Sequence, residues 1–224
     1  MRAMAINGSP RKKWNTAQLL DHALAGAAQA GAETEMVHLR DLDFTGCISC
    51  YSCKTIDGPS FGRCVLKDEL SPALERILET DVLLLGSPVY FHVQSGAMRC
   101  FLERLMFPLL EYVREPSSLY PGSLRVASFY TMNVTEERMD QTGFPAVRES
   151  TDDFLRRIFG NAVSMASTDT LQFNDYSKYA TYPTDPEHKR KRHQTVFAEE
   201  CARALELGKR LVQEARGLEK TARA

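Results

Sequence analysis

Short apolar runs alternate with segments of helical periodicity along this chain. Runs bounded by turn-forming residues predict strands, and apolar residues three and four positions apart predict helices. The expected strands are 2–7, 33–38, 81–90, 123–131 and near 161–168, and the expected helices are 16–31, 71–80, 95–106, around 150–159 and roughly 189–216. Parallel strands joined by crossover helices produce this alternation. The pattern therefore predicts an α/β fold in a single domain over 1–224: a doubly wound, five-stranded parallel sheet with helices on both faces.

The region 171–224 lies beyond the last expected strand. Its final helix carries apolar residues at a spacing that buries one face: Phe197, Cys201, Ala204, Leu205, Leu211 and Val212. We expect this C-terminal extension to pack on the domain or on a dimer partner. Its aromatic segment, 171–183, is either an arm that reaches a second subunit or an ordinary packed loop.

Charge and hydropathy disfavour several classes of protein. The chain has 28 Lys and Arg against 29 Asp and Glu, whereas nucleic-acid binders carry a basic excess. The apolar stretch at 3–6 is too short for a signal-peptide core, and no later run approaches a membrane span. We therefore expect a cytoplasmic protein with no nucleic-acid or membrane partner. In that reducing compartment the six cysteines point to metal, redox or buried roles instead of disulfides.

The loops that leave the carboxyl ends of the strands are where doubly wound sheets bind ligands. The first, "NGSPRKKWNTAQ" (7–18), matches neither common glycine-rich nucleotide motif. It places Ser9, Arg11, Asn15 and Thr16 before a helix whose first amides are unpaired, so these groups can converge on an anion such as a terminal phosphate. In the alternative, Asn15 or Thr16 only caps the helix and the basic residues are solvated.

The second loop begins with "GSPVYFHVQSG" (86–96). A Gly-Ser-Pro turn exposes backbone groups to a planar heterocycle, and Tyr90 and Phe91 can supply apolar area alongside it. In the alternative, 89–91 is the buried end of a strand and Ser95 caps a helix.

Four stretches, "NGSPRKKWNT", "GCISCYSC", "GRCVLKDEL" and "GSPVYFHVQSGAMRCFLER", carry a resemblance over about 2–135. They resemble the NADPH-dependent FMN reductase and iron–sulfur flavoprotein branch of the flavodoxin-like superfamily. The resemblance implies the strand order 2-1-3-4-5 and an FMN cofactor. It assigns the FMN phosphate to Gly8, Ser9, Arg11, Asn15 and Thr16. It assigns the border of the isoalloxazine ring to Pro88, Val89, Tyr90 and Phe91, and it adds Thr131, Met132 and Asn133 from the third loop.

The segment 46–64 holds Cys47, Cys50 and Cys53 at a three-residue step, with Cys64 eleven positions later. Ferredoxin-type loops use this step to bind a [4Fe–4S] cluster. The gap before Cys64 is longer than in the resembling family, but each doubling of a flexible loop costs only about 0.6 kcal/mol. Three interpretations stay open: an iron–sulfur cluster, unmetallated thiols that form a lid beside the flavin, and a zinc site. We expect Cys100 and Cys201 to be small buried apolar residues.

These features predict an FMN-dependent oxidoreductase that takes hydride from NAD(P)H and passes electrons to a quinone, nitro or azo compound, a flavin or a protein. No catalytic side chain is expected, because flavin N5 carries the chemistry. The basic run 187–193 either grips the 2′-phosphate of NADPH or an acidic partner, or is a solvated helix start. The resemblance implies a homodimer or homotetramer. Two alternatives are an electron-transfer module with FMN and a [4Fe–4S] cluster, and a thiol or metal redox sensor without flavin.

Overall fold

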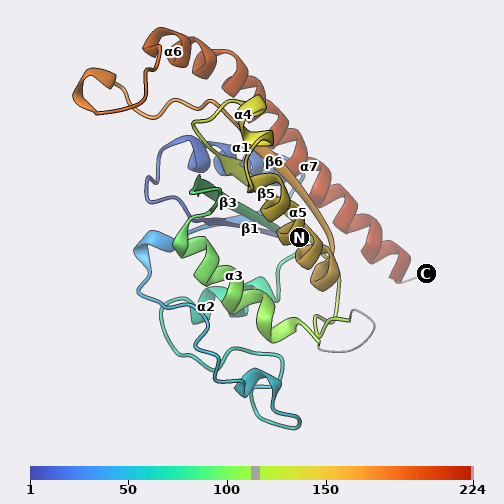
Figure 1. The fold of residues 1–224 in the computed structure, drawn as a ribbon. Helices are drawn as coiled ribbons and strands as arrows, with labels where there is room; N and C mark the ends of the chain where they lie inside the picture. The colour runs from blue at the N-terminus through green and yellow to red at the C-terminus, as the bar shows by residue number, and fades with distance from the viewer. Residues whose placement is uncertain (112–116, 223–224) are drawn as a thin grey trace.

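The computed structural model describes residues 1–111 and 117–222 and contains a strand in each expected region (Figure 1). The strands are β1 (Arg2–Asn7), β2 (Glu33–His38), β3 (Val82–Tyr90), β4 (Val93–Gln94), β5 (Leu124–Thr131) and β6 (Gly160–Ser167). The α-helices are α1 (Asn15–Gln29), α2 (Ser71–Ile77), α3 (Gly96–Leu109), α4 (Glu136–Asp140), α5 (Phe144–Phe159), α6 (Pro186–Gln194) and α7 (Val196–Ala222). Three short 3₁₀ turns lie at Leu39–Asp41, Ser52–Lys54 and Tyr176–Lys178.

The parallel strands form one sheet in the order β2-β1-β3-β5-β6. These are the five expected strands, and the α/β, flavodoxin-like fold class is confirmed. The expected strand count was wrong by one, because β4 pairs antiparallel with the end of β3 and makes a sixth strand. A strand of two residues is too short for its periodicity to stand out in a sequence.

Alternate residues of the central strands face two different helical layers. In β1, Met4 and Ile6 pack with residues of α2, α3 and α5, whereas Ala3 and Ala5 pack with residues of α1 and α7. Figure 1 shows α2 and α3 on one side of the sheet and α1 and α7 on the other. The carboxyl ends of the strands are therefore held from both faces.

Helices α1 and α7 cross with their backbones in contact. A Cβ added to Gly26 would lie 1.8 Å from the Leu205 carbonyl oxygen, and one added to Gly208 would lie 1.9 Å from that of Ala23. Only glycine allows so close an approach. The long C-terminal helix is thus packed on the α1 layer of its own chain.

Two helices differ from their expected bounds. The helix expected around 150–159 begins at Phe144, because Pro145 is tolerated in a first turn. The single helix expected over 189–216 is wrong: Thr195, with φ −109° and ψ −81°, separates α6 from α7. Across the described ranges, no helix combines the length and apolar character needed to cross a membrane.

Candidate flavin site and cysteine segment

Three loops meet at the carboxyl end of the sheet, after β1, β3 and β5. The Gly8 amide donates to the Gly86 carbonyl at 2.8 Å, which joins the first loop to β3. The Ser95 hydroxyl donates to the Gly8 carbonyl at 2.8 Å, and Thr16 Oγ1 lies 2.7 Å from Thr131 Oγ1. These hydrogen bonds fix the three loops relative to one another.

A cavity of about 380 Å³, here called the loop cavity, opens between these loops. Its walls include eleven of the twelve residues that the resemblance assigns to the cofactor, all but Gly8: Ser9, Arg11, Asn15, Thr16, Pro88, Val89, Tyr90, Phe91, Thr131, Met132 and Asn133. The other wall residues are Trp14, His92, Val134, Thr142, Phe144, Thr170, Gln172 and Tyr182. Its volume lies in the range of small-molecule sites. The structure thus brings the predicted residues together, and their binding role stays a prediction.

The polar end of the loop cavity lies at the start of α1. Ser9, Asn15 and Thr16 are buried there. Neither Asn15 nor Thr16 caps the helix, because the N-cap residue is Trp14 and no side chain among the described residues makes a capping hydrogen bond. The first amides of α1 therefore stay available to an anion, as the sequence predicts.

Arg11 and its neighbours contact the aromatic segment for which the sequence leaves open an arm that covers a second subunit's flavin or an ordinary packed loop. This strap, residues 171–182, follows β6. Arg11 donates to the Gln172 carbonyl at 2.6 Å, while Trp14 Nε1 and Asn15 Nδ2 donate to the Leu171 carbonyl at 3.0 and 2.8 Å. Because partial burial lowers the pKa of the Arg11 guanidinium, an anion in the loop cavity would offset part of that burial cost.

The apolar end of the loop cavity is formed by the β3–β4 hairpin. Tyr90 is 45% exposed and Phe91 is fully exposed, so the alternative of a buried strand end is wrong at these two residues. Phe91 and His92 form the turn with φ of 50° and 66°, a conformation that favours Asn-Gly. Ser95 does cap α3, since its hydroxyl accepts from the Met98 amide. Strained turn positions such as Phe91 and His92 concentrate at functional sites.

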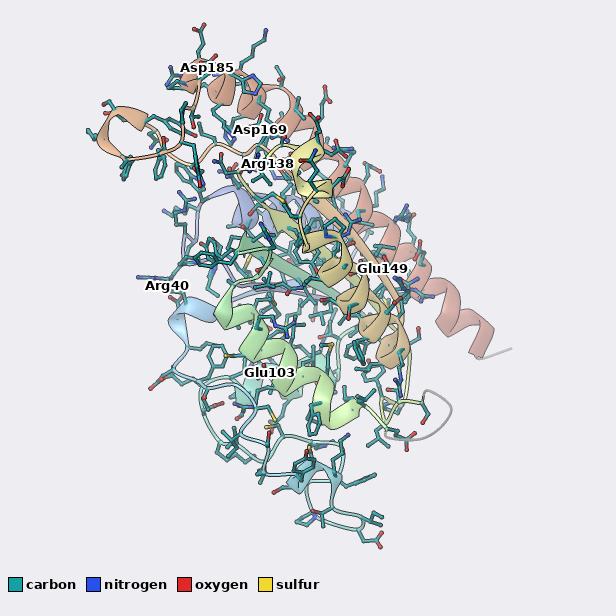
Figure 2. The ribbon with its side chains drawn as sticks, in the orientation of Figure 1. Arg40, Glu103, Arg138, Glu149, Asp169 and Asp185 are labelled. Carbon is teal, nitrogen blue, oxygen red and sulfur yellow. The ribbon has the colours of Figure 1, made fainter. Side chains whose placement is uncertain are left out.

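The basic run 187–193 is only partly solvated. Lys189 is buried and donates to Asn133 Oδ1 at 2.7 Å, and it also contacts the Asp169 carboxylate. Asp169 also accepts from His188 at 2.7 Å, and Figure 2 shows it below the helix that Asp185 begins. Lys189 thus holds the third loop in place, which neither sequence interpretation of this run included.

The cysteine segment (46–64) lies at the opposite end of the molecule from α6 (Figure 1). Its long gap does return to the other cysteines: the Gly62 amide donates to the Cys53 carbonyl at 3.0 Å, and Gly62 turns with φ of +74°. As a result Cys47, Cys50, Cys53 and Cys64 line one small cavity, here called the thiol cavity.

Arg104 of α3 anchors both ends of the cysteine segment. Its fully buried guanidinium donates to the Thr45 carbonyl at 3.0 Å and to the Cys64 sulfur at 2.9 Å. It also forms a paired contact with the Asp68 carboxylate, at 2.7 and 3.2 Å, which lowers the pKa of Asp68. One side chain therefore connects residues before, within and after the segment.

Three more contacts bind the segment to α3. The Cys47 amide donates at 3.1 Å to the carboxylate of Glu103, which Figure 2 labels on α3. Tyr51 packs edge-on against Phe107 with ring centroids 5.8 Å apart. Lys54 donates to the Pro108 carbonyl at 3.0 Å. A single helix thus supports the segment from its first cysteine to its last.

Four cysteine thiols are the ligands that an iron–sulfur cluster requires, and Lys54 and Arg104 place positive charge beside them. As they stand, however, they enclose only about 20 Å³, room for about one water. Within the described ranges, no three Cys, His, Asp or Glu residues are arranged to hold a metal ion. The segment would have to open for a cluster to enter.

The individual thiols differ in environment. Hydrogen bonds from Ser52 lower the pKa of the exposed Cys50, whereas burial raises the pKa of Cys53. Cys201 is buried as expected, and burial raises its pKa to about 11. The expectation was wrong for Cys100, which is only half-buried and lies against Gly46, a residue with no side chain to cover it.

The strand order and the helices on both faces of the sheet make the fold flavodoxin-like. The family model described as NADPH-dependent FMN reductase matches residues 1–119, more than half of the chain. The chain therefore belongs to the NADPH-dependent FMN reductase family.

The chain is also similar to individual proteins. An iron–sulfur flavoprotein of Methanocaldococcus jannaschii is 36% identical over 104 residues, which cover 46% of this chain and 51% of that protein. One from Archaeoglobus fulgidus is 33% identical over 128 residues, which cover 56% and 54%. The aligned part thus spans about half the length of these relatives.

Solved structures share the fold at low identity. The NAD(P)H:quinone oxidoreductase of Methanothermobacter marburgensis has a TM-score of 0.66 at 17% identity and covers 94% of this chain and 96% of its own. An FMN-dependent NADH-azoreductase of Bacillus anthracis, solved with FMN, has a TM-score of 0.61 at 12% identity, with coverages of 95% and 100%.

Proposed function

We propose that the chain is an FMN-dependent oxidoreductase that takes hydride from NAD(P)H and passes electrons to a small-molecule acceptor or a protein. The observation that carries the proposal is the loop cavity, where eleven of the twelve predicted residues surround one space with a polar and an apolar end. The FMN reductase family and the similarity to FMN-dependent and NAD(P)H-dependent reductases support it.

At the polar end, Ser9, Asn15, Thr16 and the first amides of α1 would hold the FMN phosphate, and Arg11 would neutralise its charge. This role requires Arg11 to exchange its contact with the Gln172 carbonyl for the phosphate. An anionic oxygen is a stronger acceptor for a guanidinium than a carbonyl is, which favours the exchange.

At the apolar end, 88–91 and the third loop would border the ring. When bound, FMN supplies the site for hydride acceptance and onward electron transfer. The protein residues orient the ring, and the exposed Tyr90 and Phe91 shield it from water. Thr131, hydrogen-bonded to Thr16, and Asn133, held by Lys189, keep the third loop against the same space.

The direct test is steady-state oxidation of NADPH and NADH by FMN-saturated protein with a soluble quinone and an azo dye as acceptors. The proposal expects turnover with at least one acceptor that needs added or bound FMN. A colourless protein that fails to bind added FMN would contradict the proposal and favour the redox-sensor alternative. A homodimer or homotetramer and a cytoplasmic location stay predictions.

A second function is favoured by the thiol cavity: an electron-transfer module with FMN and a [4Fe–4S] cluster. Its support is the return of Cys64 to the other three cysteines and the similarity to iron–sulfur flavoproteins. Iron and acid-labile sulfide should be measured on protein purified without air. Near-zero iron would eliminate this function, whereas about four irons per chain would favour it over the first.

A further inference from the structure

A second large cavity, of about 390 Å³, lies between α2, α3 and residues 59–67, which are the end of the cysteine segment and the three residues after it. Among the described residues, it shares no wall residue with the loop cavity. Cys64 lines both this cavity and the thiol cavity, while the other three clustered cysteines line only the latter. It is separate from the loop cavity, and Cys64 is the one residue of the four clustered cysteines in its wall.

Two helices supply its apolar walls. Leu74 and Leu78 are four positions apart and therefore face the same way from α2 and the turn after it. Leu105 and Leu109 of α3 are likewise four apart. The first pair is only half-buried, so a ligand that covers these side chains removes apolar surface from water.

The charged groups around this cavity are unbalanced. Arg104 at the inner end is neutralised by Asp68. Lys67 lies 3.9 Å from the Glu75 carboxylate, and because both are largely exposed this pair is weak. Arg63 is exposed and forms no ion pair with any described residue. Counting the residues that the structure describes, the mouth therefore carries one uncompensated positive charge beside an apolar interior.

We propose that this cavity binds a small apolar acid: a body of one or two rings between the leucines of α2 and α3, and a carboxylate paired with Arg63. Apolar walls with a few polar groups that fix orientation are typical of such sites. The bound body would lie against Cys64 and limit solvent access to that thiol. The proposal does not rest on the flavin function, because the two cavities have separate walls.

The test is isothermal titration calorimetry of the full chain with 2-naphthoate, in the presence of saturating FMN so that the loop cavity is filled. 2-Naphthamide, which has the same rings without the charge, is the neutral comparison. Leu74→Trp fills the cavity at a half-buried position, and Arg63→Glu reverses the charge at its mouth. Arg40→Glu is the matched control, since Arg40 is exposed and lies outside both cavities.

The proposal expects saturable binding of 2-naphthoate that Leu74→Trp abolishes, that Arg63→Glu weakens by about tenfold or more, and that Arg40→Glu leaves unchanged. Circular dichroism of each variant checks folding, and the surface position of Arg63 keeps the test informative if Leu74→Trp misfolds. If 2-naphthamide bound as tightly as 2-naphthoate, the proposed preference for a carboxylate would be overturned. Binding that survives both cavity variants, or no binding at millimolar 2-naphthoate, would overturn the site.

Discussion

The loop cavity and the cysteine segment are supported in opposite ways. The loop cavity is built by three short loops fixed at strand ends, and hydrogen bonds such as Ser95 to Gly8 connect loop to loop. The cysteine segment holds three non-glycine residues at positive φ, Ser49, Tyr51 and Asp57, and depends on one helix for its anchoring. A site at strand ends distributes its support, whereas a long segment concentrates it in a few distant side chains.

Helix α3 connects the two regions. Its N-cap Ser95 donates to Gly8 in the first loop of the loop cavity region, and Arg104 holds the cysteine segment nine residues later. At about 1.5 Å per residue these positions are about 14 Å apart along the axis. The difference in support can therefore be tested by changing one end of α3 at a time.

The largest effect is expected at Arg104. Arg104→Gln leaves the Asp68 carboxylate without its partner and frees Thr45 and Cys64, and breaking a buried pair costs about 3–5 kcal/mol. Urea unfolding should show this loss in the free energy of unfolding. Arg99→Gln, an exposed arginine on the same helix, should change it by less than about 0.5 kcal/mol. A loss below about 1 kcal/mol for Arg104→Gln would mean that the segment has other anchors.

The second effect concerns the polar end of the loop cavity. Ser9→Ala with Arg11→Ala should weaken FMN binding by about 10- to 100-fold, because charge-assisted hydrogen bonds contribute about 1.5–3 kcal/mol. Riboflavin, which has no phosphate, should bind both proteins with similar affinity. Fluorescence titration measures both dissociation constants. If FMN and riboflavin lost affinity equally, the phosphate would not be bound at this end of the loop cavity.

A smaller effect is expected at the hairpin turn. Phe91→Asn should leave the free energy of unfolding unchanged or raise it by about 0.5–1 kcal/mol, because asparagine tolerates the left-handed conformation better. FMN affinity should fall, since an apolar wall is lost. Phe61→Asn, an exposed phenylalanine in the cysteine segment, should not affect FMN affinity. A loss of stability without a loss of affinity would make Phe91 a structural residue only.

The smallest effect is expected in the pH dependence of stability, at a contact between α5 and β6. Burial raises the pKa of Asp152, whose carboxylate accepts from Ser164 at 2.5 Å. The folded state then holds this proton more tightly, so stability falls as the pH rises from the unfolded pKa, about 3.9, through the raised folded value. Asp152→Asn should reduce that fall. If the free energy of unfolding changed with pH by the same amount in both proteins across this range, the assignment to Asp152 would be contradicted.

Much of the loop cavity is predictable from sequence because its residues follow strands within a few positions. Ser9, Arg11, Asn15 and Thr16 share one loop, and the apolar run of β3 locates the next. The strap is not predictable, because it binds through the carbonyls of Leu171 and Gln172, which carry no residue signature.

The side-chain contacts that support the cysteine segment could not be predicted from the sequence either. Arg104 stands in a stretch that resembles the family, but its partners Thr45 and Cys64 are 59 and 40 residues away. In the sequence, Lys189 is one charge of a basic run. Only the structure shows that it is buried, with Asp169 and Asn133 as its partners. Long-range partners of buried charges are therefore what the sequence pattern could not reveal.

The central claim, that FMN binds in the loop cavity independently of the cysteines, is tested most directly by visible absorption after gel filtration with FMN. The account predicts retained flavin absorption, about one FMN per chain, in the natural protein and in the Cys47→Ser, Cys50→Ser, Cys53→Ser variant. Retention by neither protein, or loss of flavin only in the cysteine variant, would contradict it.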